Sequence, residues 1–144
     1  MRILLLIIAL IVGIAGEAVA QSDTQPVLES GAILDVQSIR FAENSAVLHD
    51  TSDAALQKVA KLMAAFPTTH WKIEGTALLV EREPETLALR RADAVKEALT
   101  NAGVDPARIT TGVQIDSSLK LPTLSQQELA ERRRVELIVS EQKK

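Results

Sequence analysis

The side chains in this sequence that could do chemistry favour binding over catalysis. Its only histidines, His49 and His70, do not have a metal-ligand spacing such as H-x-x-x-H, and the chain has no cysteine. It contains neither a glycine-rich phosphate loop nor a G-x-S-x-G turn that would hold a nucleophilic serine. We therefore expect a non-enzymatic protein with no catalytic residue, no metal site and no cofactor.

Arginine and glutamate residues are the remaining candidates for a binding site. Arg91 lies beside the apolar stripe of a predicted helix, whereas Arg90 points outward. A guanidinium can donate two parallel hydrogen bonds to a carboxylate, so Arg91 could bind a ligand or pair with an acid of the chain. Glu81 and Glu83 precede that helix. We interpret both as charges that favour the helix start and solubility, although their loop could also fold over a pocket.

The charge of the chain argues against nucleic acid as a partner. The formal net charge is −3, whereas nucleic-acid-binding domains usually carry a clear positive excess. The run of arginines at 132–134 is too short to change this balance. We interpret it as a solvated edge or as a contact to phosphate or carboxylate groups.

The first 20 residues have the three parts of a secretory signal peptide in order. Arg2 supplies the positive charge, residues 3–14 form an apolar run, and Ala18, Val19 and Ala20 provide a small-residue cleavage site. The apolar run is shorter than the ~20 residues that span a bilayer. We expect cleavage after Ala20 and a mature protein in the periplasm or cell envelope; membrane contact would require that the signal segment stays uncleaved.

Behind the signal peptide the sequence predicts one small domain with an aliphatic core. Phe41, Phe66 and Trp71 are its only aromatic residues, so leucine, isoleucine, valine and alanine must fill the interior. The absence of cysteine excludes disulfides and a lipid-modified cysteine. The predicted organisation has three parts: a signal peptide at 1–20, a linker or N-terminal arm at 21–34, and a folded domain at 35–144.

Four segments show the alternation of apolar and polar residues that predicts a strand. They are residues 33–41, 71–75, 109–115 and 135–139. Between them we predict three helices. The first spans 50–65 with Asp50 as its N-cap, and the second spans 84–102, beginning at Pro84 and ending before Gly103. The third is a short helix after Ser125, which begins a capping box.

This order of elements predicts an α+β fold: a two-layer α/β sandwich with helices on one face of a single mixed sheet. The apolar stripes of the helices and the inward residues of the strands should form the core. The expected buried residues are Leu56, Val59, Met63, Ile73, Val95, Leu99, Val135 and Leu137.

Six local patterns in consistent order and spacing resemble one known family. Residues 41–48 resemble the family's F-x-x-x-S-A-x-L motif, residues 73–75 resemble the strand before its G-H-T-D loop, and residues 87–95 resemble its L-S-x-x-R-A-x-x-V helix. Residues 103–109 resemble its G-V…R-I turn, Gly112 matches the glycine of the next strand, and residues 133–136 resemble its N-R-R-V-E motif. Over residues 35–140 the chain thus resembles the OmpA/MotB C-terminal family of peptidoglycan-associating domains.

This resemblance implies an exported, outer-membrane-associated or periplasmic domain that binds the cell wall non-covalently. In the family, an Asp of the G-H-T-D loop takes the ammonium of diaminopimelate in a peptide stem, and an Arg of the helix takes its carboxylate. Arg91 matches that arginine. The residues that would contact a peptide stem by this resemblance are Ser45, Thr76, Ala77, Leu78, Leu87, Arg91 and Arg134.

The sequence departs from the family where the ammonium should bind. Residues 76–79 read Thr-Ala-Leu-Leu, with neither His nor Asp, and the loop is about two residues shorter than usual. Two functions are therefore open. The domain could bind peptidoglycan weakly through a degenerate diaminopimelate site, or it could have lost wall binding and act as a periplasmic protein-protein interaction module with other envelope proteins as partners.

Overall fold

The structure is a computed structural model, and three segments of the chain are described. These are residues 30–34, 39–118 and 121–140. The predicted signal peptide and most of the predicted linker lie outside the described residues, so their boundaries remain predictions. No helix within the described segments has the length and apolar character needed to cross a membrane.

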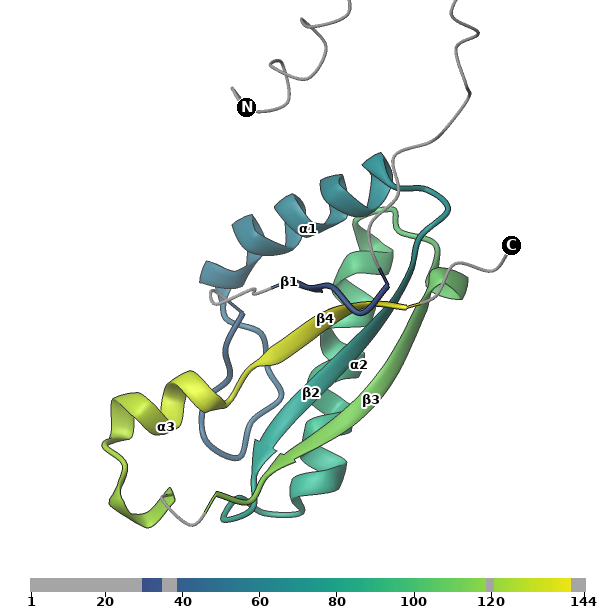
Figure 1. Ribbon diagram of the computed structural model, residues 1–144. Coiled ribbons are helices and arrows are strands. Elements are labelled where there is room, and N and C mark those ends of the chain that lie inside the picture. The colour runs from purple at the N-terminus through teal and green to yellow at the C-terminus, as the bar shows by residue number, and fades with distance from the viewer. Residues whose placement is uncertain (1–29, 35–38, 119–120, 141–144) are drawn as a thin grey trace, which may run out of the picture.

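The sheet has four strands: β1 (Ile33–Leu34), β2 (His70–Leu78), β3 (Ile109–Asp116) and β4 (Val135–Ser140). Their order across the sheet is β1-β4-β2-β3. β2 and β3 run parallel, whereas β4 is antiparallel to both of its neighbours, so the sheet is mixed (Figure 1).

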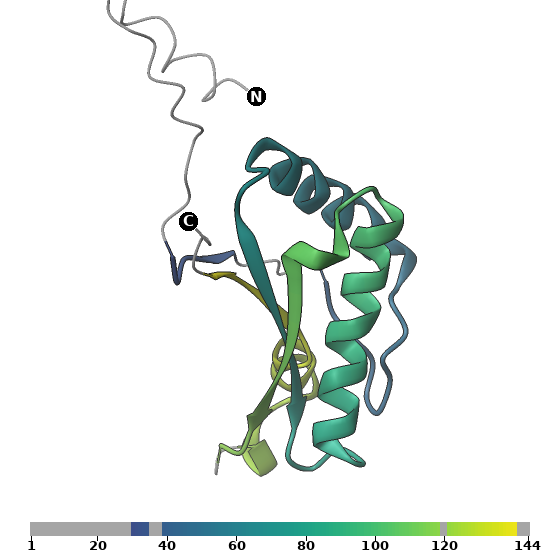
Figure 2. The same ribbon diagram turned by 90° about the vertical axis from the view of Figure 1, so that its right-hand side faces the viewer.

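In the described segments three α-helices accompany the sheet: α1 (Asp53–Ala65), α2 (Pro84–Asn101) and α3 (Gln126–Arg132). Figure 2 shows the sheet nearly edge-on, with α1 and α2 on the same side of it. The predicted two-layer α/β sandwich with a single mixed sheet is confirmed. α3 connects β3 to β4 near the end of the sheet where β4 begins.

The ends of α2 follow from local sequence. Pro84 occupies the first turn, where its missing N–H leaves no hydrogen bond unmade. At the other end Gly103 adopts a left-handed conformation with φ of 101°, and the N–H of Val104 donates to the carbonyl of Leu99 at 3.0 Å. The predicted capping box at the start of α3 is also present, since Ser125 and Glu128 bond reciprocally.

Two predicted elements differ from the structure. Asp50 is not an N-cap: it begins a single 3-10 turn, Asp50–Ser52, and no side-chain capping bond forms at the start of that turn or of α1. The strand predicted at 33–41 is represented by β1, which precedes the predicted domain start at 35, and by an isolated bridge between Arg40 and Arg134. Residues 35–38 lie outside the described segments.

The core lies between the sheet and the apolar stripes of α1 and α2. All eight residues that the sequence placed in the core are buried, and Trp71 and Ile39 are buried with them. Gly75 sets the distance between β2 and α2, because a Cβ atom built there would lie 1.9 Å from the carbonyl oxygen of Ala88. This close approach brings the first half of α2 against the end of β2. A cluster of buried polar side chains around Arg91 lies at this place.

Candidate functional site

A buried guanidinium forms the centre of the candidate site. Arg91 follows Ala88 by three residues on the face of α2 that packs on β2, and its side chain is 0% exposed. A buried charge requires partners for every donor, because an unsatisfied charged group inside a protein is strongly destabilising.

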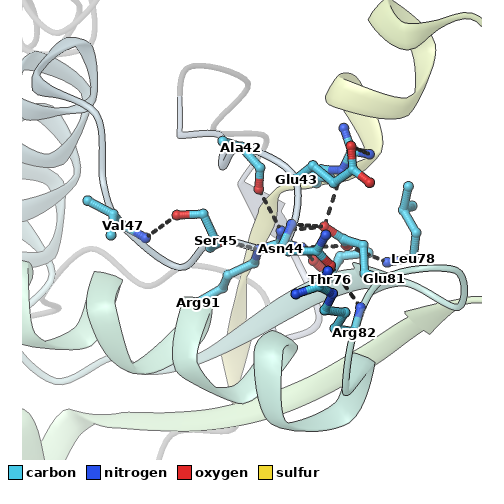
Figure 3. Close-up of polar contacts among 11 residues, drawn as sticks. Ala42, Glu43, Asn44, Ser45, Val47, Thr76, Leu78, Glu81, Arg82 and Arg91 are labelled. Carbon is cyan, nitrogen blue, oxygen red and sulfur yellow. Dashed lines mark hydrogen bonds and ion pairs between the residues drawn. The ribbon is translucent and has the colours of Figure 1, made fainter.

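Every hydrogen-bond donor of Arg91 has an acceptor within the chain. Its Nε donates to the carbonyl of Ser45 at 2.9 Å, Nη1 to the carbonyl of Thr76 at 2.9 Å, and Nη2 to the carbonyl of Ala42 at 3.0 Å. The remaining two donors go to Glu81, from Nη1 to Oε2 at 2.9 Å and from Nη2 to Oε1 at 2.7 Å (Figure 3). These five bonds use all five N–H groups of the guanidinium.

The carboxylate of Glu81 is as fully engaged as the guanidinium that it faces. Besides Arg91, the backbone N–H of Asn44 donates to Oε1 at 3.0 Å and that of Leu78 to Oε2 at 2.9 Å. Burial alone would raise the pKa of Glu81, but the hydrogen bonds from Arg91, Leu78 and Asn44 outweigh burial and hold the pKa below its ordinary value. Glu81 is therefore an ionised acid inside the fold.

Two loops close around this ion pair. Residues 42–45 supply carbonyl groups to Arg91, and residues 78–82 supply Glu81; we call these two loops together the clasp. The loops are also bonded to each other, since the N–H of Arg82 donates to Oδ1 of Asn44 at 2.8 Å. Asn44 and Glu83 have positive φ values of 52° and 45°, conformations that L-residues adopt at a cost of about 1 kcal/mol or more.

A second arginine lies on the other side of Glu81. Arg133 Nε is 3.2 Å from Glu81 Oε1, and Arg133 Nη2 is 3.8 Å from a carboxylate oxygen of Glu43. Arg133 is only 6% exposed, whereas the side chain of Glu43 is 62% exposed. Its Nε makes no hydrogen bond of good geometry. The buried part of the cluster thus has two guanidinium groups around one carboxylate.

The structure brings together four of the seven residues predicted to bind a ligand. Arg91 is the centre, Ser45 and Thr76 contribute carbonyl groups, and Leu78 contributes its N–H. Ala77 and Leu87 are buried together in a small apolar cluster with Ala88.

The seventh predicted residue, Arg134, directs its side chain elsewhere. Its guanidinium pairs with Glu136 at 2.8 Å, and only its carbonyl takes part in this region, accepting from the N–H of Thr76 at 2.9 Å. The neighbouring Arg133 is the residue that reaches the cluster. The alternation of β4, continued two residues before the strand, could have identified it, because Arg133, Val135 and Leu137 are all buried.

The sequence-based interpretation of Glu81 was wrong. Glu81 is 5% exposed and bonded to Arg91, so it is not a solvated charge at a helix start. Glu83, in contrast, is exposed immediately before α2. Neither position in the loop nor residue type distinguishes these two acids. They differ because the conformation of the turn after Leu78 directs Glu81 inward and Glu83 toward solvent.

Comparison with known proteins relates this chain to one family. Residues 40–134 match the OmpA family. The peptidoglycan-associated lipoprotein from Burkholderia pseudomallei is a similar solved structure, with a TM-score of 0.63, 25% identity, and coverage of 71% of this chain and 88% of that chain.

Two further solved structures have the same fold. The periplasmic domain of Helicobacter pylori MotB matches with a TM-score of 0.64, 21% identity, and coverage of 79% of this chain and 76% of that chain. The OmpA-like domain of FopA1 from Francisella tularensis matches with a TM-score of 0.58, 18% identity, and coverage of 73% and 71%. Among curated proteins no match was found. Because the family match spans more than half of the sequence, this chain belongs to the OmpA family.

Proposed function

We propose that this chain is an exported, non-enzymatic cell-envelope protein whose OmpA domain associates with peptidoglycan only weakly, through a degenerate diaminopimelate site. Family membership supports the wall as the partner, as does the likeness to a peptidoglycan-associated lipoprotein. The apolar run and small-residue site of residues 1–20 support export.

One observation carries the proposal that binding is weak: Arg91 has no free donor. A ligand carboxylate could engage this guanidinium only after Glu81 has left, because Glu81 holds both terminal nitrogens. The other half of the family's two-charge contact has no evident anionic group either, since Leu78 and its neighbours in 76–79 are uncharged. Loss of one charge-assisted hydrogen bond costs about 1.5–3 kcal/mol, which is roughly a ten- to hundredfold loss of affinity.

A second candidate function is contact with other envelope proteins. The turn that follows β2 exposes two apolar residues in succession, with Leu79 57% and Val80 67% exposed. Both residues belong to the loop that supplies Glu81, so they stand directly beside the closed site. Adjacent exposed apolar side chains favour association with another protein surface.

Cosedimentation with purified peptidoglycan tests the proposal. The purified protein should remain mostly in the supernatant under conditions in which a peptidoglycan-associated lipoprotein sediments. A matched comparison uses the double variant Leu79→Ser, Val80→Ser, which removes the apolar pair but leaves Arg91 and Glu81 in place. Equal and weak sedimentation of both proteins supports the proposal. Tight sedimentation of the wild-type protein would overturn it.

A further inference from the structure

The surroundings of Glu81 have the composition of a carboxylate receptor. Oε1 faces Arg91 Nη2 at 2.7 Å, the N–H of Asn44 at 3.0 Å and Arg133 Nε at 3.2 Å. Oε2 faces Arg91 Nη1 at 2.9 Å and the N–H of Leu78 at 2.9 Å. Two guanidinium groups and two backbone amides therefore converge on one carboxylate, and these donors come from parts of the chain other than Glu81 itself.

Glu81, the side chain that fills this receptor, belongs to a turn at the surface of the protein. Glu81 itself is buried, but Val80 and Arg82 on either side of it are exposed. Its turn is held by three further bonds: the N–H of Leu79 donates to the carbonyl of Asp116, that of Glu81 to the carbonyl of Leu78, and that of Arg82 to Oδ1 of Asn44. The turn contributes no residue to the main core between the sheet and α1. Withdrawal of Glu81 would therefore break its bonds to Leu78, Asn44 and Arg91 but remove no side chain from the main core.

The two positive charges of the receptor need a negatively charged partner. Without Glu81, Arg91 and Arg133 would leave two positive charges in a region where both side chains are more than nine-tenths buried. The other acid in contact, Glu43, is mostly exposed and reaches only Arg133, at 3.8 Å. An empty receptor would be unstable, and a carboxylate from solution matches the bidentate fork of Arg91 and the adjacent charge of Arg133.

We propose that Glu81 is a built-in ligand that keeps this carboxylate receptor closed, and that an external carboxylate can take its place. The proposal deepens the proposed function by naming the regulation of the same site, and it rests on that function only for the biological ligand. A tethered group competes at an effective concentration of about millimolar or more. External carboxylates must therefore compete with Glu81, and we expect them to bind the native chain at least tenfold more weakly than a chain whose Glu81 has been removed.

Thermal unfolding of the purified protein in sodium acetate, compared with sodium chloride of equal ionic strength, tests this inference. The variant Glu81→Ala empties the receptor and should unfold at a lower temperature than the wild-type protein. Acetate should then raise its midpoint saturably, by about 5 °C at roughly ten times the acetate Kd, and chloride should not. The wild-type protein and the control Glu85→Ala, which removes an exposed acid from the first turn of α2, should need at least tenfold more acetate for the same rise.

A second variant covers the case in which Glu81→Ala does not fold. Glu81→Gln keeps the shape of the side chain but offers a neutral amide, which competes poorly with a carboxylate for two arginines. In this variant acetate should shift the amide resonances of Leu78 and Asn44, at concentrations at least tenfold lower than in the wild-type protein. The proposal is overturned if acetate acts no differently from chloride on both variants, or if it acts equally on the wild-type protein.

These experiments contain no peptidoglycan, so they fail independently of the proposed function. Tight wall binding by the wild-type protein would contradict the proposed function and leave the receptor intact. The absence of an acetate effect would contradict the receptor and leave weak wall binding unchanged.

Discussion

Glu81 and Arg91 lie ten residues apart in the chain and share two hydrogen bonds, of 2.7 and 2.9 Å, while both side chains are fully buried. A buried ion pair of this kind adds little net stability, because the desolvation of both charges offsets most of their attraction. The pair does make the two residues depend on each other, since either charge buried without the other would strongly destabilise the fold. In this chain the pair joins the loop after β2 to α2 and makes the site a closed unit.

Removal of Arg91 should destabilise the fold rather than simply weaken a binding site. Arg91→Ala would leave Glu81 as a buried carboxylate without its main partner, and the loss should be about 3–5 kcal/mol in the free energy of unfolding. Urea denaturation measures it. The double variant Arg91→Met, Glu81→Gln should lose less than Arg91→Ala alone, because it removes both charges. A loss below ~1 kcal/mol for Arg91→Ala would contradict the buried ion pair.

The stability of the protein should fall in acid, in part through Glu81. Its pKa is lowered by folding from an ordinary value of 4.5, so its contribution is present above about that pH and is lost as the pH falls through the folded-state pKa. Urea denaturation from pH 7 down to pH 3 checks this, with Glu81→Gln for comparison. The variant should lose less stability than the wild-type protein below pH ~4.5; equal pH slopes would show that Glu81 does not titrate as argued.

Two glycines should respond differently to the same substitution. A Cβ atom at Gly75 would lie 1.9 Å from the backbone oxygen of Ala88, whereas at Gly112 the nearest atom is the Cε of Lys72, at 2.8 Å. A backbone atom of a packed helix cannot move aside, but a lysine side chain can. Gly75→Ala should therefore cost about 1–3 kcal/mol or more by forcing α2 away from β2, and Gly112→Ala should cost less than ~1 kcal/mol. Chemical denaturation of both variants decides this, and equal costs would contradict the close approach.

The core should depend on Leu99 far more than on Leu89 of the same helix. Leu99 is 0% exposed between α2 and the sheet, whereas Leu89 is 41% exposed. Leu99→Ala should lower the free energy of unfolding by about 2–5 kcal/mol, and Leu89→Ala should lower it by less than ~1 kcal/mol. If chemical denaturation gives similar losses for the two, the assignment of the buried face of α2 is incorrect.

The exported protein should begin at Gln21. Cleavage after Ala20 follows from a short apolar run and a small-residue site. Intact-mass measurement on protein recovered from the periplasmic fraction checks it. A mature protein that retains Met1 and fractionates with membranes would contradict the prediction.

Much of the fold is predictable from local patterns because those patterns have local causes. Pro84 and Gly103 mark the ends of α2, and alternation marks β2 and β4, since burial on one face imposes a fixed period. The start of α1 is less predictable, because Asp50 is a favourable N-cap by type but forms a 3-10 turn in its place.

The site is only half predictable, because its chemistry depends on contacts between distant segments. Arg91 follows from the family's helix motif, but its acceptors on Ala42, Ser45 and Thr76 are backbone carbonyls, which carry no sequence signal. The role of Glu81 depends on the turn after Leu78, whose conformation no local motif specifies. An acid in a polar loop has the same sequence appearance whether it is solvated or buried.

The clasp also has a consequence for the order in which the chain assembles. Arg91 bonds to the carbonyls of Ala42 and Ser45, which lie 49 and 46 residues earlier, whereas Glu81 is only ten residues away. Closing a long loop costs more entropy than closing a short one, so contacts within the continuous β2–α2–β3 segment form at lower cost. Glu81 can neutralise the guanidinium within that segment before the N-terminal loop arrives. We therefore expect the charge to enter the interior already paired, without waiting for a distant partner.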